Sequence, residues 1–172
     1  MPVSFTVFAT PVGPAVLASS EIGVVALRFG SDEAALVADL TARFPPAECR
    51  RDDASLAGVR RAVLDQLGGE PVDQAVPLDL RGTPFQLEVW QALRAIPRGE
   101  TRTYAEVAVA VRRPRAARAV GRACGANPVA LLVPCHRVVA SGGGLGGYAG
   151  GLERKRALLD LERPDRGAFD AG

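Results

Sequence analysis

The chain of 172 residues contains one histidine and three cysteines, and this scarcity excludes several kinds of site. A closed zinc site needs four Cys or His ligands, usually including a C-x-x-C pair that this sequence lacks, so we expect no metal. The odd number and wide spacing of Cys49, Cys124 and Cys135 favour a reducing compartment over a disulfide framework. Any chemistry that pairs a nucleophile with a histidine must use His136.

Long apolar segments are also absent. The longest uninterrupted apolar stretch covers residues 128–135, which is far too short to span a bilayer. Residues 1–14 carry no basic segment followed by an apolar one, so we expect a cytoplasmic protein that does not bind membranes. With 48% hydrophobic and 23% charged residues, the composition is that of a globular chain with room for one domain or two small ones.

The net charge of +2 conceals an uneven distribution along the chain. Residues 1–90 hold seven Arg and twelve Asp or Glu, whereas residues 91–172 hold fourteen Arg or Lys and seven Asp or Glu. Residues 94–137 alone hold nine Arg and two Glu. Such a basic patch is the usual electrostatic footprint of a phosphate-backbone partner, and a solvated helix face in an arginine-rich chain is the alternative.

The first half of the sequence predicts a small α+β domain. Three short apolar segments separated by turn residues predict a three-stranded antiparallel sheet, and two amphipathic segments predict helices. The strands are expected around residues 3–7 and over 15–19 and 22–29, and the helices over 33–44 and 55–67. This acidic segment carries no recognisable constellation for chemistry, so residues 1–81 are interpreted as an amino-terminal α/β structural domain with its linker.

The second half predicts a mostly helical domain over residues 82–163. Thr83 and Thr103 each begin a capping box, which marks the start of a helix. The predicted helices cover residues 84–96, 104–111, 115–124 and 152–162. The two middle helices are joined by a tight turn and the second is rich in Arg, which is typical of a winged helix-turn-helix-like DNA-binding motif. Residues 164–172 are predicted to form a flexible tail.

Cys135 directly precedes the single histidine, His136. Adjacent side chains in an extended chain point to opposite sides, so direct proton transfer between them would need a sharp turn or a bridging water. Taken in isolation, such a pair is more often a buried thiol beside a surface histidine.

A series of motifs surrounds this pair and extends from about Phe85 to Glu162. The series comprises Phe85-Gln86-X-X-Val89-Trp90, Ile96-Pro97-X-Gly99-Glu100-Thr101, Tyr104, Arg118-Ala119-Val120-Gly121, Asn127-Pro128-Val129, Pro134-Cys135-His136-Arg137-Val138-Val139 and Gly146-Gly147-Tyr148-Ala149-Gly150-Gly151-Leu152. Together these motifs resemble the O6-alkylguanine-DNA alkyltransferases, also called methylated-DNA–protein-cysteine methyltransferases. Over residues 1–80 the resemblance is architectural.

The resemblance implies a reaction and four catalytic residues. Cys135 would accept the alkyl group as a thiolate, linked through a water to His136, which Glu162 would orient. Tyr104 would hydrogen-bond the flipped guanine and help to neutralise the departing oxygen. Because water does not cleave the resulting thioether, the transfer would be irreversible and the protein would act once.

The same resemblance implies which residues contact guanine and DNA. The expected guanine-binding residues are Asn127, Val138, Tyr148, Ala149 and Gly150. The expected DNA-binding residues are Arg115, Ala116, Ala117, Arg118, Ala119, Gly121 and Arg122. Arg118 would replace the extruded nucleotide in the base stack, and the small residues would let the helix approach the minor groove closely.

The implied partner is double-stranded DNA that contains O6-alkylguanine, with O4-alkylthymine as a second candidate lesion. We expect a monomer that needs no cofactor. Two other classes compete with this interpretation: a protein that binds lesions or operators without chemistry, and a Cys-His hydrolase. A pure binder has no need of an acceptor thiol, and a hydrolase needs a labile acyl intermediate in place of a stable thioether.

Overall fold

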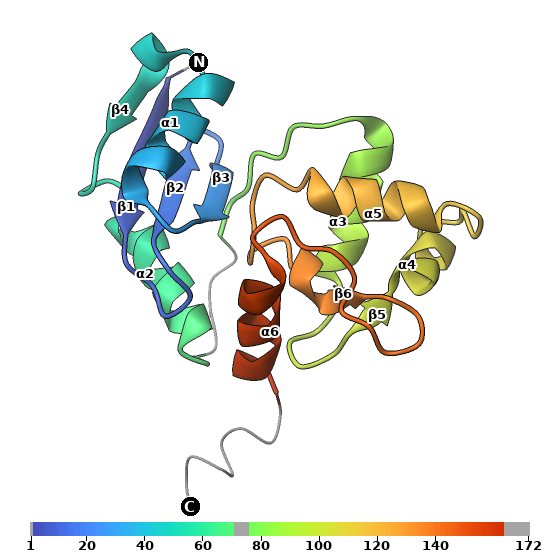
Figure 1. Ribbon diagram of the computed structural model, residues 1–172. Coiled ribbons are helices and arrows are strands. Elements are labelled where there is room, and N and C mark those ends of the chain that lie inside the picture. Colours follow the sequence, from blue (N-terminus) through green and yellow to red (C-terminus); the bar gives the residue numbers. More distant parts are fainter. Residues whose placement is uncertain (1, 71–75, 164–172) are drawn as a thin grey trace, which may run out of the picture. The chain divides into compact units, whose positions relative to one another are not determined.

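The computed structural model describes residues 2–70 and 76–163 (Figure 1), so the predicted tail over residues 164–172 lies outside it. The chain divides into two compact units. The first comprises Met1–Arg81 together with Pro128–Ala130, and the second comprises Gly82–Asn127 together with Leu131–Gly172.

The first unit is built on a sheet in the order β3-β2-β1-β4. Its strands are β1 (Val3–Phe8), β2 (Ala15–Ser19), β3 (Val24–Phe29) and β4 (Cys49–Arg51). The first three are antiparallel neighbours, whereas β4 pairs in parallel with β1. The predicted α+β class is confirmed, but the prediction of a three-stranded antiparallel sheet is wrong. The fourth strand has three residues, two of them exposed arginines, so it has no alternating apolar pattern.

Helices and one distant segment complete the first unit. The helical elements are α1 (Glu33–Arg43), the 3₁₀ turn η1 (Pro46–Glu48) and α2 (Ala57–Leu67). The carboxylate of Asp32 caps α1 by accepting from the Ala34 N–H at 2.9 Å, and Leu36 and Leu40 of this helix enter the core. The distant segment Pro128–Ala130 pairs with Leu27 of β3 through two backbone hydrogen bonds.

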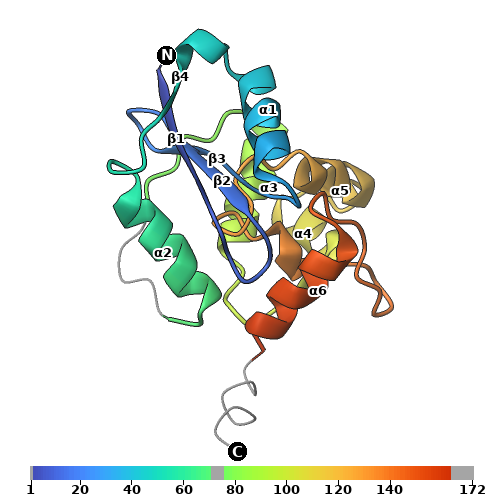
Figure 2. The same cartoon turned by 60° about the vertical axis from the view of Figure 1, so that its left-hand side comes forward.

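The second unit is mostly helical, as predicted (Figure 2). It contains α3 (Pro84–Arg94), β5 (Arg102–Thr103), α4 (Tyr104–Ala110), α5 (Ala117–Gly125), the 3₁₀ turn η2 (Cys135–Arg137), β6 (Val138–Val139) and α6 (Leu152–Leu161). Helices α3, α4 and α5 contact one another, and β5 pairs in parallel with β6. The indole N–H of Trp90 on α3 donates to the Ala123 carbonyl at 2.9 Å, which fixes α5 against α3.

The expected helix-turn-helix is formed by α4 and α5. Complete capping boxes begin α3 at Thr83 and α4 at Thr103, as the sequence predicted. The turn between α4 and α5 contains Arg112, whose φ of 62° is left-handed and allows a tight connection.

Every helix found in residues 2–70 and 76–163 is too short or too polar to cross a membrane.

Candidate active site

The acceptor candidate Cys135 lies in a tight turn rather than in an extended segment. Its N–H donates to the Val133 carbonyl at 2.8 Å, and the Arg137 N–H donates to the Pro134 carbonyl at 3.0 Å. The Arg137 bond, together with the bond from the Val138 N–H to the Cys135 carbonyl, forms the 3₁₀ turn η2, in which successive side chains diverge by about 120° because one turn contains three residues. Cys135, His136 and Arg137 therefore point in three different directions from one short segment, and all three are buried.

Asn127 connects the end of α5 to this turn. Its side-chain amide donates to the Val133 carbonyl at 2.8 Å and to the Cys135 sulfur at 3.2 Å. Because Asn127 follows α5 by two residues, its two hydrogen bonds fix the position of the thiol relative to the helix-turn-helix. An N–H directed at sulfur also favours the thiolate over the thiol.

His136 and Glu162 form a buried pair behind the thiol. Nε2 of His136 lies 2.8 Å from Oε1 of Glu162, and the imidazole is 0% exposed. Burial lowers the pKa of His136 below its usual 6.5, although the Glu162 carboxylate acts to raise it. Since a carboxylate only accepts hydrogen bonds, Nε2 carries the proton and Nδ1 retains a free electron pair. In the described part of the chain Nδ1 has no hydrogen-bond partner, so it is available as a base.

Arg137 gives the same carboxylate a second partner. Its guanidinium donates to Glu162 through Nε at 2.9 Å and through Nη2 at 2.7 Å, and Nη1 donates to the Ile96 carbonyl at 2.7 Å. Burial disfavours the charged form of Glu162, but the contacts with Arg137 and His136 outweigh it and lower the carboxyl pKa to about 2. The carboxylate is therefore ionised near neutral pH and orients two adjacent side chains of the turn.

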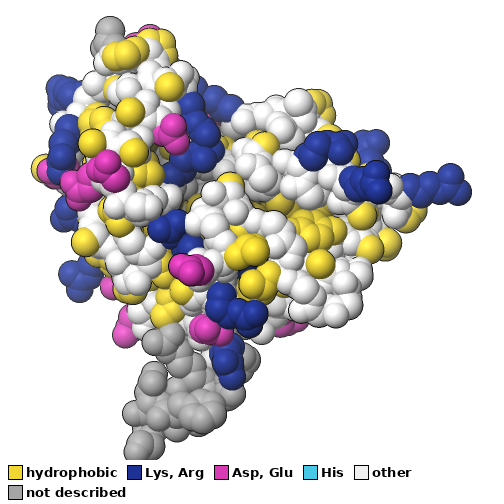
Figure 3. Space-filling model, viewed as in Figure 1, with side chains coloured by type: hydrophobic (Ala, Val, Ile, Leu, Met, Phe, Trp, Pro, Cys, Tyr) yellow, Lys and Arg dark blue, Asp and Glu magenta, His cyan; other side chains and the backbone are white. Residues whose placement is uncertain are grey.

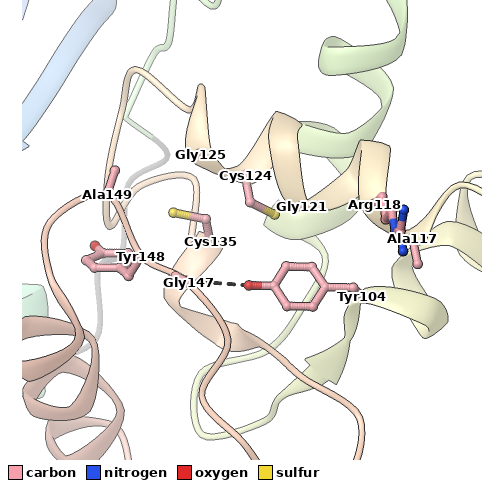
Figure 4. Close-up of a pocket in the computed structure, with 10 residues that line it drawn as sticks. All are labelled: Tyr104, Ala117, Arg118, Gly121, Cys124, Gly125, Cys135, Gly147, Tyr148 and Ala149. Carbon is pink, nitrogen blue, oxygen red and sulfur yellow. Dashed lines mark hydrogen bonds between the residues drawn. The ribbon is translucent and has the colours of Figure 1, made fainter.

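A cavity of about 440 Å³ opens in front of Cys135. It is lined by Tyr104, Ala117, Arg118, Gly121, Cys124, Gly125, Cys135, Gly147, Tyr148 and Ala149. Figure 4 shows Tyr148 and Ala149 at one end of this group and Ala117 and Arg118 at the other, with the two thiols between them. The cavity has the size of a small-molecule site and is lined mainly by apolar and aromatic groups, which suits a planar base.

The position of Tyr104 depends on a capping box and on a glycine. Thr103 caps α4 and places Tyr104 at its first residue, and the tyrosine hydroxyl donates to the Gly147 carbonyl at 3.4 Å. At Gly146, whose φ is +74°, a Cβ atom would lie 2.6 Å from the Tyr104 hydroxyl. A side chain at position 146 would therefore strain the backbone and displace the phenol.

Helix α5 presents a basic face beside the cavity. Val120 and Ala123 are buried against the unit, whereas Arg118 and Arg122 are exposed on the other side of the helix. Basic side chains lie over the α4–α5 end of the second unit in Figure 3, and they are arginines because the single lysine is buried on α6. A helix with exposed arginines and little other side-chain bulk can lie close to a phosphate backbone.

Comparison with known proteins agrees with this geometry. Residues 84–164 match the family described as 6-O-methylguanine DNA methyltransferase, DNA binding domain. The chain is 54% identical over 110 residues to the methylated-DNA–protein-cysteine methyltransferase of Mycobacterium tuberculosis, which covers 62% of this chain and 67% of that protein. The crystal structure of Mycobacterium tuberculosis OGT in complex with DNA has a TM-score of 0.81 at 40% identity and covers 97% of this chain and 99% of that chain.

The chain belongs to the methylated-DNA–protein-cysteine methyltransferases. It is also 44% identical over 150 residues to the bifunctional transcriptional activator/DNA repair enzyme Ada of Escherichia coli. That match covers 87% of this chain and 42% of Ada, so the chain spans about two fifths of the length of that relative. Membership of the methyltransferase family confirms the resemblance on which the predicted site residues rest.

Most of the predicted site residues lie together. Asn127 and Cys135 form one hydrogen-bonded pair and His136 and Glu162 form another, and the two pairs meet at the adjacent residues Cys135 and His136. Seven predicted residues line the cavity: Tyr104, Ala117, Arg118, Gly121, Cys135, Tyr148 and Ala149.

Other predicted residues lie outside the cavity lining. They are Arg115, Ala116, Ala119, Arg122, Val138 and Gly150. The backbone of Val138 is already engaged, because its N–H donates to the Cys135 carbonyl and its carbonyl accepts from Lys155. A hydrogen bond from guanine to the Val138 carbonyl would therefore have to share this oxygen with the Lys155 ammonium.

Three residues of the site were missed in the sequence. Arg137 and Lys155 are buried polar partners of the turn, and Gly147 supplies the carbonyl that Tyr104 binds. Lys155 carries one available signal, because it is the single lysine among 21 basic residues. Cys124 also lines the cavity, as a thiol whose pKa burial raises to about 12.

Gly150 limits the cavity indirectly. A Cβ atom at position 150 would lie 2.9 Å from Cε2 of the Tyr148 ring, which does line the cavity. We expect Gly150→Trp to push this ring into the cavity. Transfer from O6-benzylguanine should then fall about tenfold more than transfer from an O6-methylguanine duplex, since the size of an apolar pocket discriminates between substrates by about 1–3 kcal/mol. The measurement is single-turnover transfer with each substrate. Gly144→Trp is the control, because that exposed position has no contact closer than 3.7 Å. Equal losses on both substrates would contradict the effect on pocket size.

Proposed function

We propose that this protein repairs O6-alkylguanine in duplex DNA by transferring the alkyl group irreversibly to Cys135. The proposal rests on two buried hydrogen bonds, one from Asn127 to the Cys135 sulfur and one between His136 and Glu162. Cys135 lines an apolar cavity beside the basic helix α5. O4-alkylthymine is a second candidate substrate, and we propose that the protein acts as a monomer without a cofactor.

Base extrusion is required before any chemistry. The O6 atom of a stacked guanine lies inside the duplex, so α5 would bind the minor groove and the damaged nucleotide would rotate into the cavity. Arg118 lies at the cavity edge and is exposed, which supports its insertion into the space that the nucleotide leaves. Tyr148 and Ala149 would form the wall opposite α5, with the Ala149 N–H available to the base edge.

The reaction is a nucleophilic displacement. The His136 imidazole takes the thiol proton, directly or through one bridging water, and the Glu162 carboxylate stabilises the imidazolium that forms. The Cys135 sulfur then attacks the alkyl carbon: the C–S bond forms, the C–O6 bond breaks, and the electron pair goes to the guanine oxygen. The Tyr104 hydroxyl, which donates to the Gly147 carbonyl at 3.4 Å, would exchange that bond for one to the anionic base, which leaves as guanine after protonation.

Stoichiometry tests this function. When the protein is mixed with excess O6-methylguanine duplex, we expect one guanine to be restored per protein molecule and repair to stop there. The readout is the amount of restored guanine against protein concentration. Continued repair beyond one equivalent would refute irreversible transfer, and no restored guanine would refute the proposed activity.

Arg118→Ala separates base extrusion from chemistry. We expect this variant to lose at least about tenfold in transfer from methylated duplex, because unstacking costs a few kcal/mol, while transfer from free O6-benzylguanine changes little. Arg122→Ala is the matched control on the same helix, since Arg122 is exposed and lies outside the cavity lining. It should weaken DNA binding in a salt-dependent way without slowing transfer at saturating DNA. Equal losses of Arg118→Ala on both substrates would show that Arg118 does not act in extrusion.

The proposal also assigns a compartment and a role to each part of the chain. A protein that acts on DNA and depends on a reduced thiol fits the cytoplasm, and all three cysteines are free thiols. Residues 1–81 would serve as a structural domain and linker, and residues 82–163 would bind DNA and accept the alkyl group.

A further inference from the structure

The cavity is lined by two thiols, and the function proposed above uses one of them. Cys124 enters the cavity from α5 and Cys135 enters it from η2 (Figure 4). Asn127 bonds to both residues, because its backbone N–H donates to the Cys124 carbonyl at 3.2 Å and its side-chain amide donates to the Cys135 sulfur at 3.2 Å. One residue therefore fixes both cysteines beside the space that a flipped base would fill.

Cys124 is unsuited to be the first acceptor. Burial raises its pKa to about 12, and the neighbouring Cys135 acts in the same direction. Since the thiolate is the reactive form of cysteine, the neutral Cys124 thiol leaves the attack on an O6-alkylguanine to Cys135. It can react with an electrophile that is stronger than the lesion and is held within its reach.

The transfer itself creates such an electrophile when the alkyl group carries a leaving group on its second carbon. A 2-chloroethyl group on Cys135 is the simplest case. The Cys135 sulfur attacks the second carbon, so that a C–S bond forms, the C–Cl bond breaks and chloride leaves a three-membered sulfonium ring. The Cys124 sulfur then attacks a ring carbon. A second thioether forms, the ring C–S bond breaks with its electron pair returning to the Cys135 sulfur, and the thiol proton passes to water.

Other nucleophiles at the cavity are weaker. Among the residues that line it, the remaining nucleophilic side chains are those of Tyr104 and Tyr148. Burial raises the pKa of both phenols, so they stay protonated near neutral pH, and the Tyr104 hydroxyl already donates to the Gly147 carbonyl. Sulfur is also more polarizable than oxygen, which favours its attack on an alkyl carbon. Water is then the main competitor of Cys124.

We propose that Cys124 is a second alkyl acceptor, which captures a two-carbon group after its transfer to Cys135 and leaves the two sulfur atoms joined by a two-carbon bridge. The inference rests on the proposed function, because Cys135 must first take the group from guanine. Its consequence is that a lesion with two electrophilic carbons is removed without leaving a reactive sulfonium beside the DNA.

The first experiment mixes the protein with a duplex that contains O6-(2-chloroethyl)guanine. Trypsin releases both cysteines in one peptide, residues 123–137, because the chain has no Lys or Arg between Arg122 and Arg137. Among the alkylated molecules, we expect the bridged peptide to exceed the peptide with a 2-hydroxyethyl group on Cys135 by at least about tenfold, because a nucleophile held in place outcompetes water.

Two variants and one substrate serve as controls. In Cys124→Ser the ratio of bridged to hydrolysed product should fall by at least about tenfold, and this ratio counts only molecules that have accepted a group. Cys49→Ser should leave the ratio unchanged, since Cys49 lies on β4 outside the cavity lining. An O6-ethylguanine duplex should give an ethyl group on Cys135 and a free thiol at Cys124, because ethyl carries no second leaving group.

The second experiment uses the unmodified protein without DNA. 1,3-Dichloroacetone joins two neighbouring thiols, and we expect it to bridge Cys124 and Cys135 within the same tryptic peptide and to leave Cys49 unbridged. The absence of this bridge, or a chloroethylated duplex repaired with a free Cys124 thiol, would overturn the inference and leave the proposed function standing. No transfer from either duplex, together with a bridge formed by 1,3-dichloroacetone, would refute the proposed function and support the placement of the second acceptor.

Discussion

His136→Ala should slow alkyl transfer from a methylated duplex by at least about 100-fold at pH 7, because loss of a positioned general base costs about two to four orders of magnitude. The imidazole is fully buried beside the Cys135 turn, and no other histidine exists in the chain to replace it. The measurement is single-turnover transfer at saturating DNA, with DNA affinity determined separately.

The pH dependence should change with the rate. Burial lowers the pKa of His136, so the imidazole is neutral at pH 7 and its capacity to accept a proton is lost only as the pH falls below its usual range. Without it, transfer depends on direct ionisation of the thiol, and the profile of His136→Ala should move toward higher pH. A variant with an unchanged profile would show that another group activates Cys135.

Glu162→Gln should be the most destabilising substitution in the site. From the sequence alone, this change is expected to slow transfer and leave the fold intact. The contacts predict more, because the guanidinium of Arg137 would remain buried without the carboxylate that accepts two of its hydrogen bonds. Removing one member of a buried ion pair costs about 3–5 kcal/mol in the free energy of unfolding.

Urea denaturation gives the measurement, and a double variant gives the control. Arg137→Met combined with Glu162→Gln removes both charges, so it should lose less stability than the sum of the single variants. Additive losses, or a loss below about 1 kcal/mol for Glu162→Gln, would contradict the ion-pair account.

Acid should destabilise the protein in two pH ranges. The native pKa of Glu162 is lowered from 4.5 to about 2, so the stability due to its ionised form is present above the unfolded value and is lost as the pH falls toward the native one. The lowered native pKa of His136 also makes the protein less stable in acid. As the pH falls below 6.5, the imidazole is protonated in the unfolded chain before it is protonated in the native protein. Glu162→Gln should flatten the lower of these two ranges.

Local sequence signals predicted much of the second unit. The capping boxes at Thr83 and Thr103 depend on residues three positions apart, so they could be identified without tertiary information. The helix-turn-helix and the final helix were predicted with ends within a few residues of those observed. The positions of Cys135, His136 and Glu162 came from the family resemblance, because no local pattern brings together residues 26 positions apart.

Features that depend on distant contacts were missed. Strand β4 forms because β1 offers a free edge, which its own sequence does not reveal. The tight turn at Cys135 follows from backbone bonds to Val133 and Pro134 within an apolar segment that resembles a strand. The buried roles of Arg137 and Lys155 require knowing which carbonyls and carboxylates surround them, since most arginines and lysines in proteins are exposed.

Peptide mass mapping of the protein after one exposure to an O6-methylguanine duplex tests the central claim most directly. The account predicts a single methyl group on the sulfur of Cys135 and unmodified thiols at Cys49 and Cys124, with the matching guanine restored in the DNA. A methyl group on either of the other cysteines, or a restored guanine with no modified protein, would contradict it.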